Sequence, residues 1–118
     1  MTLTAKGRTI ALATVLTGVH VGLLDADGRE EQDINYARVP VSFGEPSEAG
    51  DQTVRLNDER VEFPPYAADA KAQLRFWALY DDPLEGTELL RADLERPMLP
   101  MRGEAPMFPP GVMSVGLR

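Results

Sequence analysis

The strongest strand signal in this sequence is the run Leu74-Arg75-Phe76-Trp77-Ala78-Leu79-Tyr80. Its side chains are largely apolar on both faces, with Leu74, Phe76, Ala78 and Tyr80 on one and Arg75, Trp77 and Leu79 on the other. A strand that is apolar on both faces must be covered on both, as the inner strand of a packed sheet is. We therefore predict a central strand here.

Shorter strand-like runs lie on either side of it, and each ends at turn residues. Val19, Val21 and Leu23 share one face of a strand that ends at the Asp27-Gly28 turn. Residues 28–35 that follow are acidic and polar, which predicts a solvated loop. The remaining strands are expected at 53–56, 61–63, 87–94 and 111–117, with one short strand within 104–108 and a tight reversal at Asn57-Asp58.

Pro40 interrupts the next strand pattern, in which Val39, Val41 and Phe43 share a face. Proline has no N–H to give to a strand ladder, so this strand is expected at a sheet edge or a bulge. The arginines at 38, 75 and 91 are expected on polar strand faces, pairing with neighbouring acids.

Residues 4–16 are the best helix candidate, with Thr4 as N-cap and Gly18 ending the run. One short helix followed by about seven or eight short strands predicts a mainly β protein: an antiparallel β-sandwich, jelly-roll-like, or a small barrel. The length of 118 residues fits a single domain spanning 1–118.

The composition excludes several classes of site and partner. There is no cysteine, so no disulfide, thiolate metal site or cysteine nucleophile can form. The net charge of −7 argues against nucleic acid and anionic membranes as partners. The apolar residues 10–24 fall short of the ~20 that a spanning helix needs, and no clear cleavage site marks a signal peptide.

No catalytic constellation stands out. His20 is the only histidine, and no partner acid or nucleophile is placed near it by local spacing. Oxygen ligands to Ca²⁺ could come from Asp25, Asp27, Glu30, Glu31 and Asp33. The glycine comes too early for an EF-hand loop and no helix pair flanks it, so a solvated turn is favoured. No glycine-rich phosphate loop is present. We therefore expect no enzyme activity, no cofactor and no bound metal.

The aromatic and methionine residues admit two interpretations each. Trp77 or Tyr66 could stack on a sugar, but the surrounding alternation favours a place in the core. The methionines at 98, 101, 107 and 113 are either adaptable packing or a patch that repacks against a partner.

The stretch 95–110 is rich in proline, which disfavours helix and predicts an extended arm over the surface. This arm and the acidic loop at 25–35 are the surfaces expected to meet a partner. The candidate interface residues on the arm are Pro97, Met98, Pro100, Met101, Met107, Pro109 and Pro110.

The order of the elements resembles a group of small tailed-phage virion proteins of the tail fibre or minor tail type. The resemblance rests on short motifs along nearly the whole chain: Val19-His20-Val21-Gly22-Leu23-Leu24-Asp25, Tyr36-Ala37-Arg38-Val39-Pro40-Val41-Ser42-Phe43-Gly44, Val61-Glu62-Phe63-Pro64, Phe76-Trp77-Ala78-Leu79-Tyr80-Asp81, Thr87-Glu88-Leu89-Leu90 and Phe108-Pro109-Pro110-Gly111-Val112-Met113-Ser114-Val115. This chain is more charged than such proteins, and its segment at 95–110 is unusual among them.

The resemblance implies a non-enzymatic structural protein of the virion, made in the host cytoplasm. It would assemble in symmetric copies, as a homo-oligomer and with other virion proteins, without nucleic acid or membrane. Its position would be in the tail, a fibre or the baseplate, or on the capsid as a decoration or cement protein. The alternative is a carbohydrate-binding β-sandwich module, and a small hydrolase using His20 is a third hypothesis.

Overall fold

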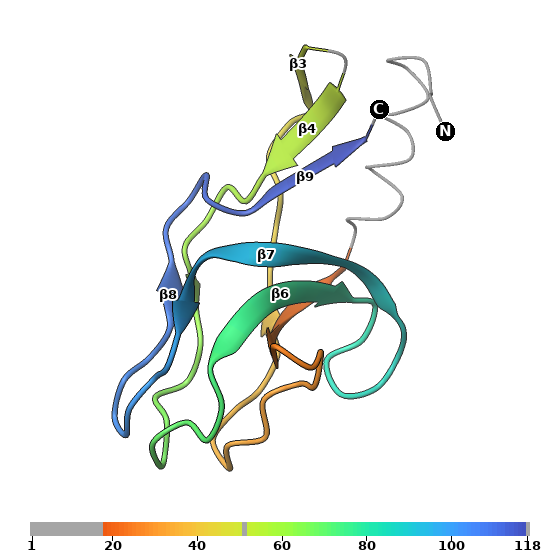
Figure 1. The fold of residues 1–118 in the computed structure, drawn as a ribbon. Helices are drawn as coiled ribbons and strands as arrows, with labels where there is room; N and C mark the ends of the chain where they lie inside the picture. Colours follow the sequence, from red (N-terminus) through yellow and green to blue (C-terminus); the bar gives the residue numbers. More distant parts are fainter. Residues whose placement is uncertain (1–17, 51, 118) are drawn as a thin grey trace.

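The structure is a computed structural model that describes residues 18–50 and 52–117 (Figure 1). The helix predicted over residues 4–16 lies outside these residues. The described chain consists of strands joined by turns and extended segments. The strands are β1 (His20–Asp25), β2 (Val39–Pro40), β3 (Ser47–Ala49), β4 (Gln52–Leu56), β5 (Val61–Glu62), β6 (Leu74–Tyr80), β7 (Glu88–Met98), β8 (Met107–Phe108) and β9 (Ser114–Leu117).

The strand pairs in the described part of the chain are antiparallel and form three sheets. The largest sheet has the order β2-β1-β6-β7, the second has the order β3-β4-β9, and β5 pairs with β8. In Figure 1, β6 and β7 curve across the middle of the molecule, with β4 and β9 above them. The predicted mainly β class with antiparallel pairing is confirmed.

β6 lies inside the largest sheet, with β1 on one side and β7 on the other. Trp77 is 4% exposed, and Ala78 and Leu79 are 0% exposed. Because successive side chains in a strand point to opposite faces, both faces of β6 are covered. The prediction of a central strand is confirmed.

The side chains of β6 nevertheless do not alternate between the two faces along the whole strand. Leu74 packs in the main cluster with Trp77 and Leu79, whereas Phe76 packs beside Ala78 in a smaller cluster. The pairing of β6 with β7 shifts register between Leu74 and Phe76. Such an irregularity changes which face the next side chain takes. The assignment of Leu74 to the face of Phe76 was therefore wrong.

The main hydrophobic cluster draws on all three sheets. Because residues from each sheet are buried against one another, the burial of apolar surface holds the sheets together. Its buried members are Val19, Val21, Leu23, Val41, Phe43, Val61, Phe63, Leu74, Trp77, Leu79, Met113 and Val115.

Pro40 lies in β2, which is an edge strand of the largest sheet. An edge accommodates proline because one side of the strand needs no N–H donors. Val41 and Phe43 are buried in the main cluster, and Val39 packs against it, so this face is as predicted. The expectation of an edge strand is confirmed.

Asn57 does not form the tight reversal that was predicted. It is 2% exposed, and its backbone N–H donates to the carbonyl of Met113 over 3.0 Å. It also forms an isolated bridge with Phe43. A buried asparagine must satisfy its amide with partners from the protein, and here these are the carbonyls of Glu59 and Pro109 and the N–H of Met113. The prediction of a tight reversal was therefore wrong, because Asn57 is buried in the connection between β4 and β5.

The proline-rich stretch after β7 runs back along an earlier segment of the same chain. The N–H groups of Phe63, Tyr66 and Ala70 donate to the carbonyls of Pro106, Glu104 and Pro100 over 2.8, 2.9 and 2.8 Å. The short strand expected within 104–108 is β8, which pairs with β5. β7 itself continues to Met98, beyond the predicted end at residue 94.

Candidate partner-binding groove

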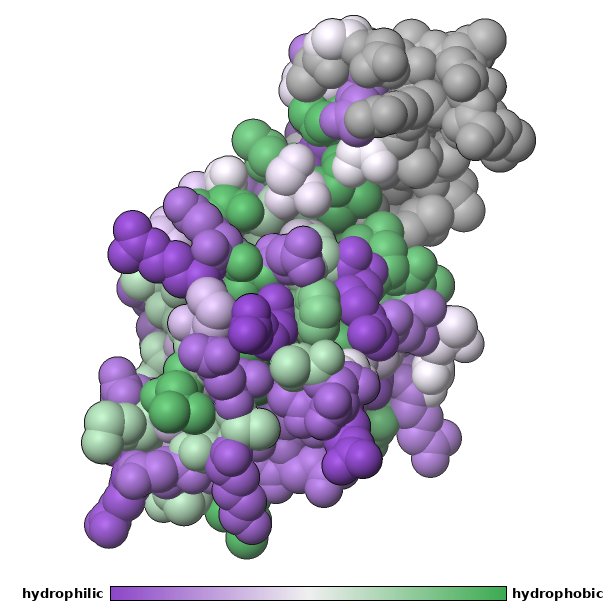
Figure 2. Space-filling view, in the orientation of Figure 1, coloured by the Kyte–Doolittle hydropathy of each residue, from purple (hydrophilic) through white to green (hydrophobic). Residues whose placement is uncertain are grey.

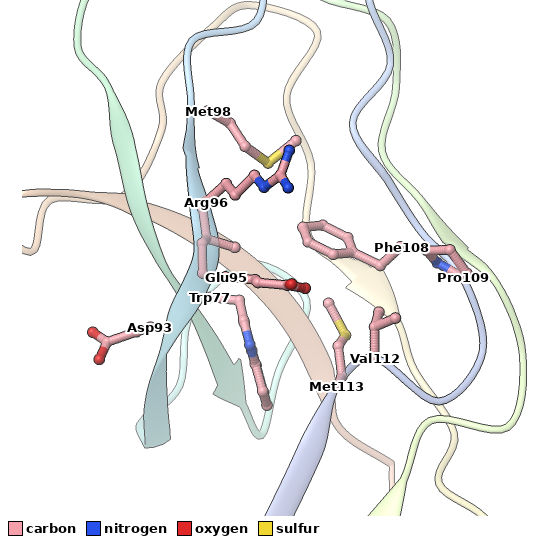
Figure 3. A pocket seen from close by; sticks show the side chains of 10 residues that line it. Trp77, Asp93, Glu95, Arg96, Met98, Phe108, Pro109, Val112 and Met113 are labelled. Atoms are coloured by element: carbon pink, nitrogen blue, oxygen red, sulfur yellow. The ribbon is translucent and has the colours of Figure 1, made fainter.

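A largely apolar groove of about 430 Å³ lies between β7 and the segment that leads from β8 to β9 (Figure 3). Apolar side chains form most of its lining, and charged side chains from β7 stand along one side. The lining residues are Trp77, Asp93, Leu94, Glu95, Arg96, Met98, Phe108, Pro109, Val112 and Met113.

One wall of the groove follows from an irregularity in β7. Asp93 pairs with Phe76 and Met98 pairs with Leu74, so residues 94–97 face only one residue of β6. The additional residues must leave the regular ladder and bend the strand. In Figure 3, the side chains of Glu95, Arg96 and Met98 turn toward the groove, while that of Asp93 turns away.

The opposite wall is fixed by Asn57. Its side-chain Nδ2 donates to the carbonyl of Pro109 over 3.1 Å, and its Oδ1 accepts the N–H of Met113 over 2.8 Å. The N–H of Gly111 donates to the Asn57 carbonyl over 2.8 Å, and Gly111 has a φ of 85°. Glycine adopts this conformation without steric cost. Asn57 thus holds the turn that presents Val112.

A second cavity of about 230 Å³ adjoins the groove, because Met98 lines both. Exposed apolar side chains surround the two: Leu99 is 58% exposed, Met101 58%, Met107 43% and Val112 50%. On the face seen in Figure 2, hydrophobic residues form separate areas within a mainly hydrophilic surface. A cluster of exposed apolar residues beside a cavity is typical of a binding surface.

The predicted interface residues divide by exposure. Pro100 is buried and Met98 is half-buried. The exposed ones are Pro97, Met101, Met107, Pro109 and Pro110. Met98 and Pro109 line the groove, and Met98, Pro100 and Met107 line the second cavity. Met113, one of the methionines considered for such a patch, also lines the groove, but the sequence did not point to Phe108 or Val112, because their role depends on how β7 and the last turn meet.

The acidic loop contains a cluster that the sequence did not predict, made of Glu30, Tyr36 and Arg38. Arg38 donates from Nε and Nη2 to the two carboxylate oxygens of Glu30, each over 2.9 Å. Tyr36 Oη donates to Glu30 Oε2 over 2.6 Å and accepts the N–H of Leu23 over 3.0 Å. Residues 28–35 do form a loop exposed to solvent, as predicted, but the sequence did not show that Glu30 within it is held in this cluster.

The same arginine holds the loop between β6 and β7. Arg38 Nη1 donates to the carbonyls of Asp82 and Glu85 over 3.0 and 2.6 Å. Its Cζ lies 3.5 Å from the centroid of the Tyr80 ring. A guanidinium with several fixed donors can join two loops in this way. The expected pairing of arginines with acids is confirmed for Arg38, and for Arg91 with Glu88 over 2.8 Å.

These contacts shift the pKa values of the cluster. Burial acts to raise the pKa of Glu30, but the hydrogen bonds from Arg38 and Tyr36 and the charge of Arg38 outweigh it and hold that pKa below 4.5. Burial, together with the hydrogen bond to Glu30, raises the pKa of Tyr36 well above its usual value. At neutral pH the cluster thus contains a carboxylate, a phenol and a guanidinium.

The residues considered for catalysis and metal binding lie apart from the groove. His20 pairs with Pro40 and Tyr80 in the largest sheet. Asp25 Oδ1 accepts the N–H groups of Asp27 and Arg29 over 2.9 and 3.0 Å, so it shapes the turn. Within the described residues, no group of three histidine, aspartate or glutamate side chains is arranged to hold a metal ion. No helix in this part of the chain has the length and apolarity needed to cross a membrane.

The aromatic residues considered for sugar stacking are buried. Trp77 is 4% exposed and Tyr66 is 3% exposed. Tyr66 Oη donates to Glu31 Oε2 over 2.8 Å, which fixes the ring against the acidic loop. A sugar ring needs an exposed aromatic face, so a carbohydrate platform built on either residue is excluded.

The described residues thus form a β protein of antiparallel sheets that carries a largely apolar groove. A family model described as podophage GP4 fiber I protein gp80 matches residues 5–116, and the chain belongs to this family. The resemblance to tailed-phage proteins of the tail fibre type is thereby confirmed, and the family is one of virion fibre components. No curated protein matches the chain.

Proposed function

We propose that the chain is a non-enzymatic structural subunit of a phage fibre, and that it assembles in symmetric copies and with other virion proteins. The observation that carries this proposal is the family match over residues 5–116. The described sheets share one hydrophobic cluster, which supports a sandwich-like domain as the assembling unit. Within the virion, the family description favours a fibre over capsid decoration.

The proposed contact surface consists of the groove, the second cavity and the exposed apolar residues around them. Val112 and Met107 are 50% and 43% exposed, and their burial against a partner would be favourable. Methionine suits such a contact because its unbranched side chain adapts to the shape it meets. Of the predicted interface residues of the arm, those that line the groove or the second cavity are Met98, Pro100, Met107 and Pro109.

The described side chains support a structural role. In the cluster at Glu30, the polar groups of Glu30, Tyr36 and Arg38 form hydrogen bonds with one another and with carbonyls of the β6–β7 loop. Such a cluster stabilises loops and leaves no group poised for proton transfer to a substrate.

The test is incorporation of variants into particles. Val112→Glu places a charge in the groove, and the matched control Leu84→Glu places one at a side chain that is 85% exposed in the β6–β7 loop. Because burying an unpaired charge is costly, Val112→Glu should lower the amount found in purified particles about tenfold. The control should enter normally. Normal incorporation of a folded Val112→Glu protein would exclude this contact surface.

A further inference from the structure

β7 forms one edge of the largest sheet, and among the described residues it pairs only with β6. The strand is 11 residues long, whereas β2 at the other edge has 2 residues and contains Pro40. A long edge strand presents unpaired N–H and C=O groups that can pair with a further strand. β7 is therefore the edge at which the sheet can be extended.

The middle of β7 reads Leu90-Arg91-Ala92-Asp93-Leu94, and this segment is complementary to itself. When two copies run antiparallel about Ala92, Arg91 of each faces Asp93 of the other. Leu90 of each faces Leu94 of the other, and the two Ala92 residues meet at the axis. Directly opposed residues share a face of the sheet, so these contacts are opposite-charge and apolar pairs.

The side chains lie on the faces that this pairing requires, and Arg91 would exchange its contact with Glu88 of its own strand, over 2.8 Å, for Asp93 of the second copy. Arg91 and Asp93 are exposed, and both lie on the face of Phe76. Asp93 is the register partner of Phe76, and Arg91 Cζ lies 5.5 Å from its ring centroid. In Figure 3, Asp93 points away from the groove. Leu90 and Leu94 pack on the core side instead, where a second copy would extend the apolar surface.

The pairing cannot extend far beyond Leu94. The ladder with β6 is interrupted over residues 94–97, and Pro97 has no N–H to donate. A five-residue strand pair buries less than the roughly 1,200 Å² of a standard stable interface. We therefore expect weak, concentration-dependent association of isolated chains, strengthened where other contacts hold the copies together.

We infer that two copies of this chain pair through their β7 edges, antiparallel and with a two-fold axis at Ala92. This inference rests on the proposed assembly function and names the partner at this edge as a second copy. It uses the edge of β7, where Asp93 and Leu94 border the groove, and not the exposed residues around Val112 on the opposite wall.

Disulfide cross-linking tests the register directly, because the chain contains no cysteine. In Ala92→Cys the two cysteines would face each other with Cα atoms about 4.5–5.5 Å apart, which a disulfide spans. In Asp93→Cys the two cysteines would be diagonal, at roughly 8 Å, beyond that reach. Mild oxidation should therefore produce a covalent dimer of Ala92→Cys and little of Asp93→Cys.

Charge variants test the pairing rule on the Ala92→Cys background. Adding Asp93→Arg alone or Arg91→Asp alone should lower the dimer yield severalfold, because each places like charges opposite one another. Adding both should restore the yield. Glu45→Arg, at an exposed site in the loop between β2 and β3, is the control for net charge and should leave the yield unchanged.

The outcomes separate this inference from the proposed function. Absent cross-linking of folded Ala92→Cys, equal cross-linking at residue 93, or a yield unaffected by the charge variants would overturn the β7 pairing. These solution measurements do not depend on particle incorporation. If Val112→Glu entered particles normally while Ala92→Cys cross-linked as expected, the groove would lose its role and the β7 pairing would stand.

Discussion

At the scale of single residues, Gly22 shows why the Glu30 cluster can form against β1. A Cβ built on Gly22 would lie 2.7 Å from Tyr36 Oη, 2.8 Å from Glu30 Oε2 and 3.0 Å from Tyr80 Cε2. Only glycine leaves room there for the phenol and the carboxylate. No sequence pattern indicates this role, since Gly22 occupies an ordinary position in a strand pattern.

Gly22→Ala should therefore destabilise the protein by about 1–3 kcal/mol, because the new methyl group forces the surrounding side chains apart. Denaturant unfolding at neutral pH measures the change. Gly44→Ala is the matched control, since its Cβ would meet neighbours at 3.6 and 3.7 Å, which is ordinary contact. Equal stability of the two variants would show that the Gly22 contact is not restrictive.

At the scale of the elements, the sequence predicted the individual strands better than their partners. β6 and β1 were predicted because apolar alternation is a local property of the chain. Two turns end in glycines with positive φ, Gly28 at 80° and Gly86 at 81°. Glycine adopts such values readily, which agrees with the turn-forming sequences at these positions. Pairing of β5 with β8 joins segments far apart in the sequence, so no local pattern reveals it.

The candidate site was predicted only in part from the sequence. The arm at 95–110 was singled out by composition, and several of its residues line the groove or surround it. The bulge over residues 94–97 was missed because it depends on the register with β6. Glu30 was placed among solvated acids because its two partners become neighbours only when the loop closes.

The loop between β6 and β7 should depend on Arg38 for its order. Replacing Arg38 by Met keeps much of the apolar stem but removes the donors to the Asp82 and Glu85 carbonyls. We expect faster amide hydrogen exchange over residues 81–87, measured by mass spectrometry. The control is Arg29→Met, at an exposed position. Unchanged exchange in the Arg38 variant would contradict the role of this tether.

At the scale of the whole molecule, the Glu30 cluster links stability to pH. The pKa of Glu30 is lower in the folded protein than its ordinary value of 4.5, so the folded state binds fewer protons than the unfolded state. Ionised Glu30 therefore contributes to the free energy of unfolding above about pH 4.5, and this contribution is lost as the pH falls through the pKa that Glu30 has in the folded protein.

Glu30→Gln should consequently unfold more easily than the parent protein at pH 7, and the difference should shrink as the pH falls below about 4.5. Thermal unfolding followed across pH 3–7 measures this. Part of the acid sensitivity should remain in the variant, because two other carboxyl groups also have lowered pKa values. A hydrogen bond from the N–H of Ala67 lowers the pKa of Asp33, and hydrogen bonds from the N–H groups of Glu85 and Leu84 lower the pKa of Asp82. A constant difference at all pH values would contradict the assignment to Glu30.

Whether this chain is a structural subunit of a phage fibre can be measured most directly by quantitative mass spectrometry of purified particles. A fibre subunit should be present at a fixed copy number well below that of the capsid subunits. Absence from purified particles, or a copy number matching that of the capsid subunits, would contradict this role.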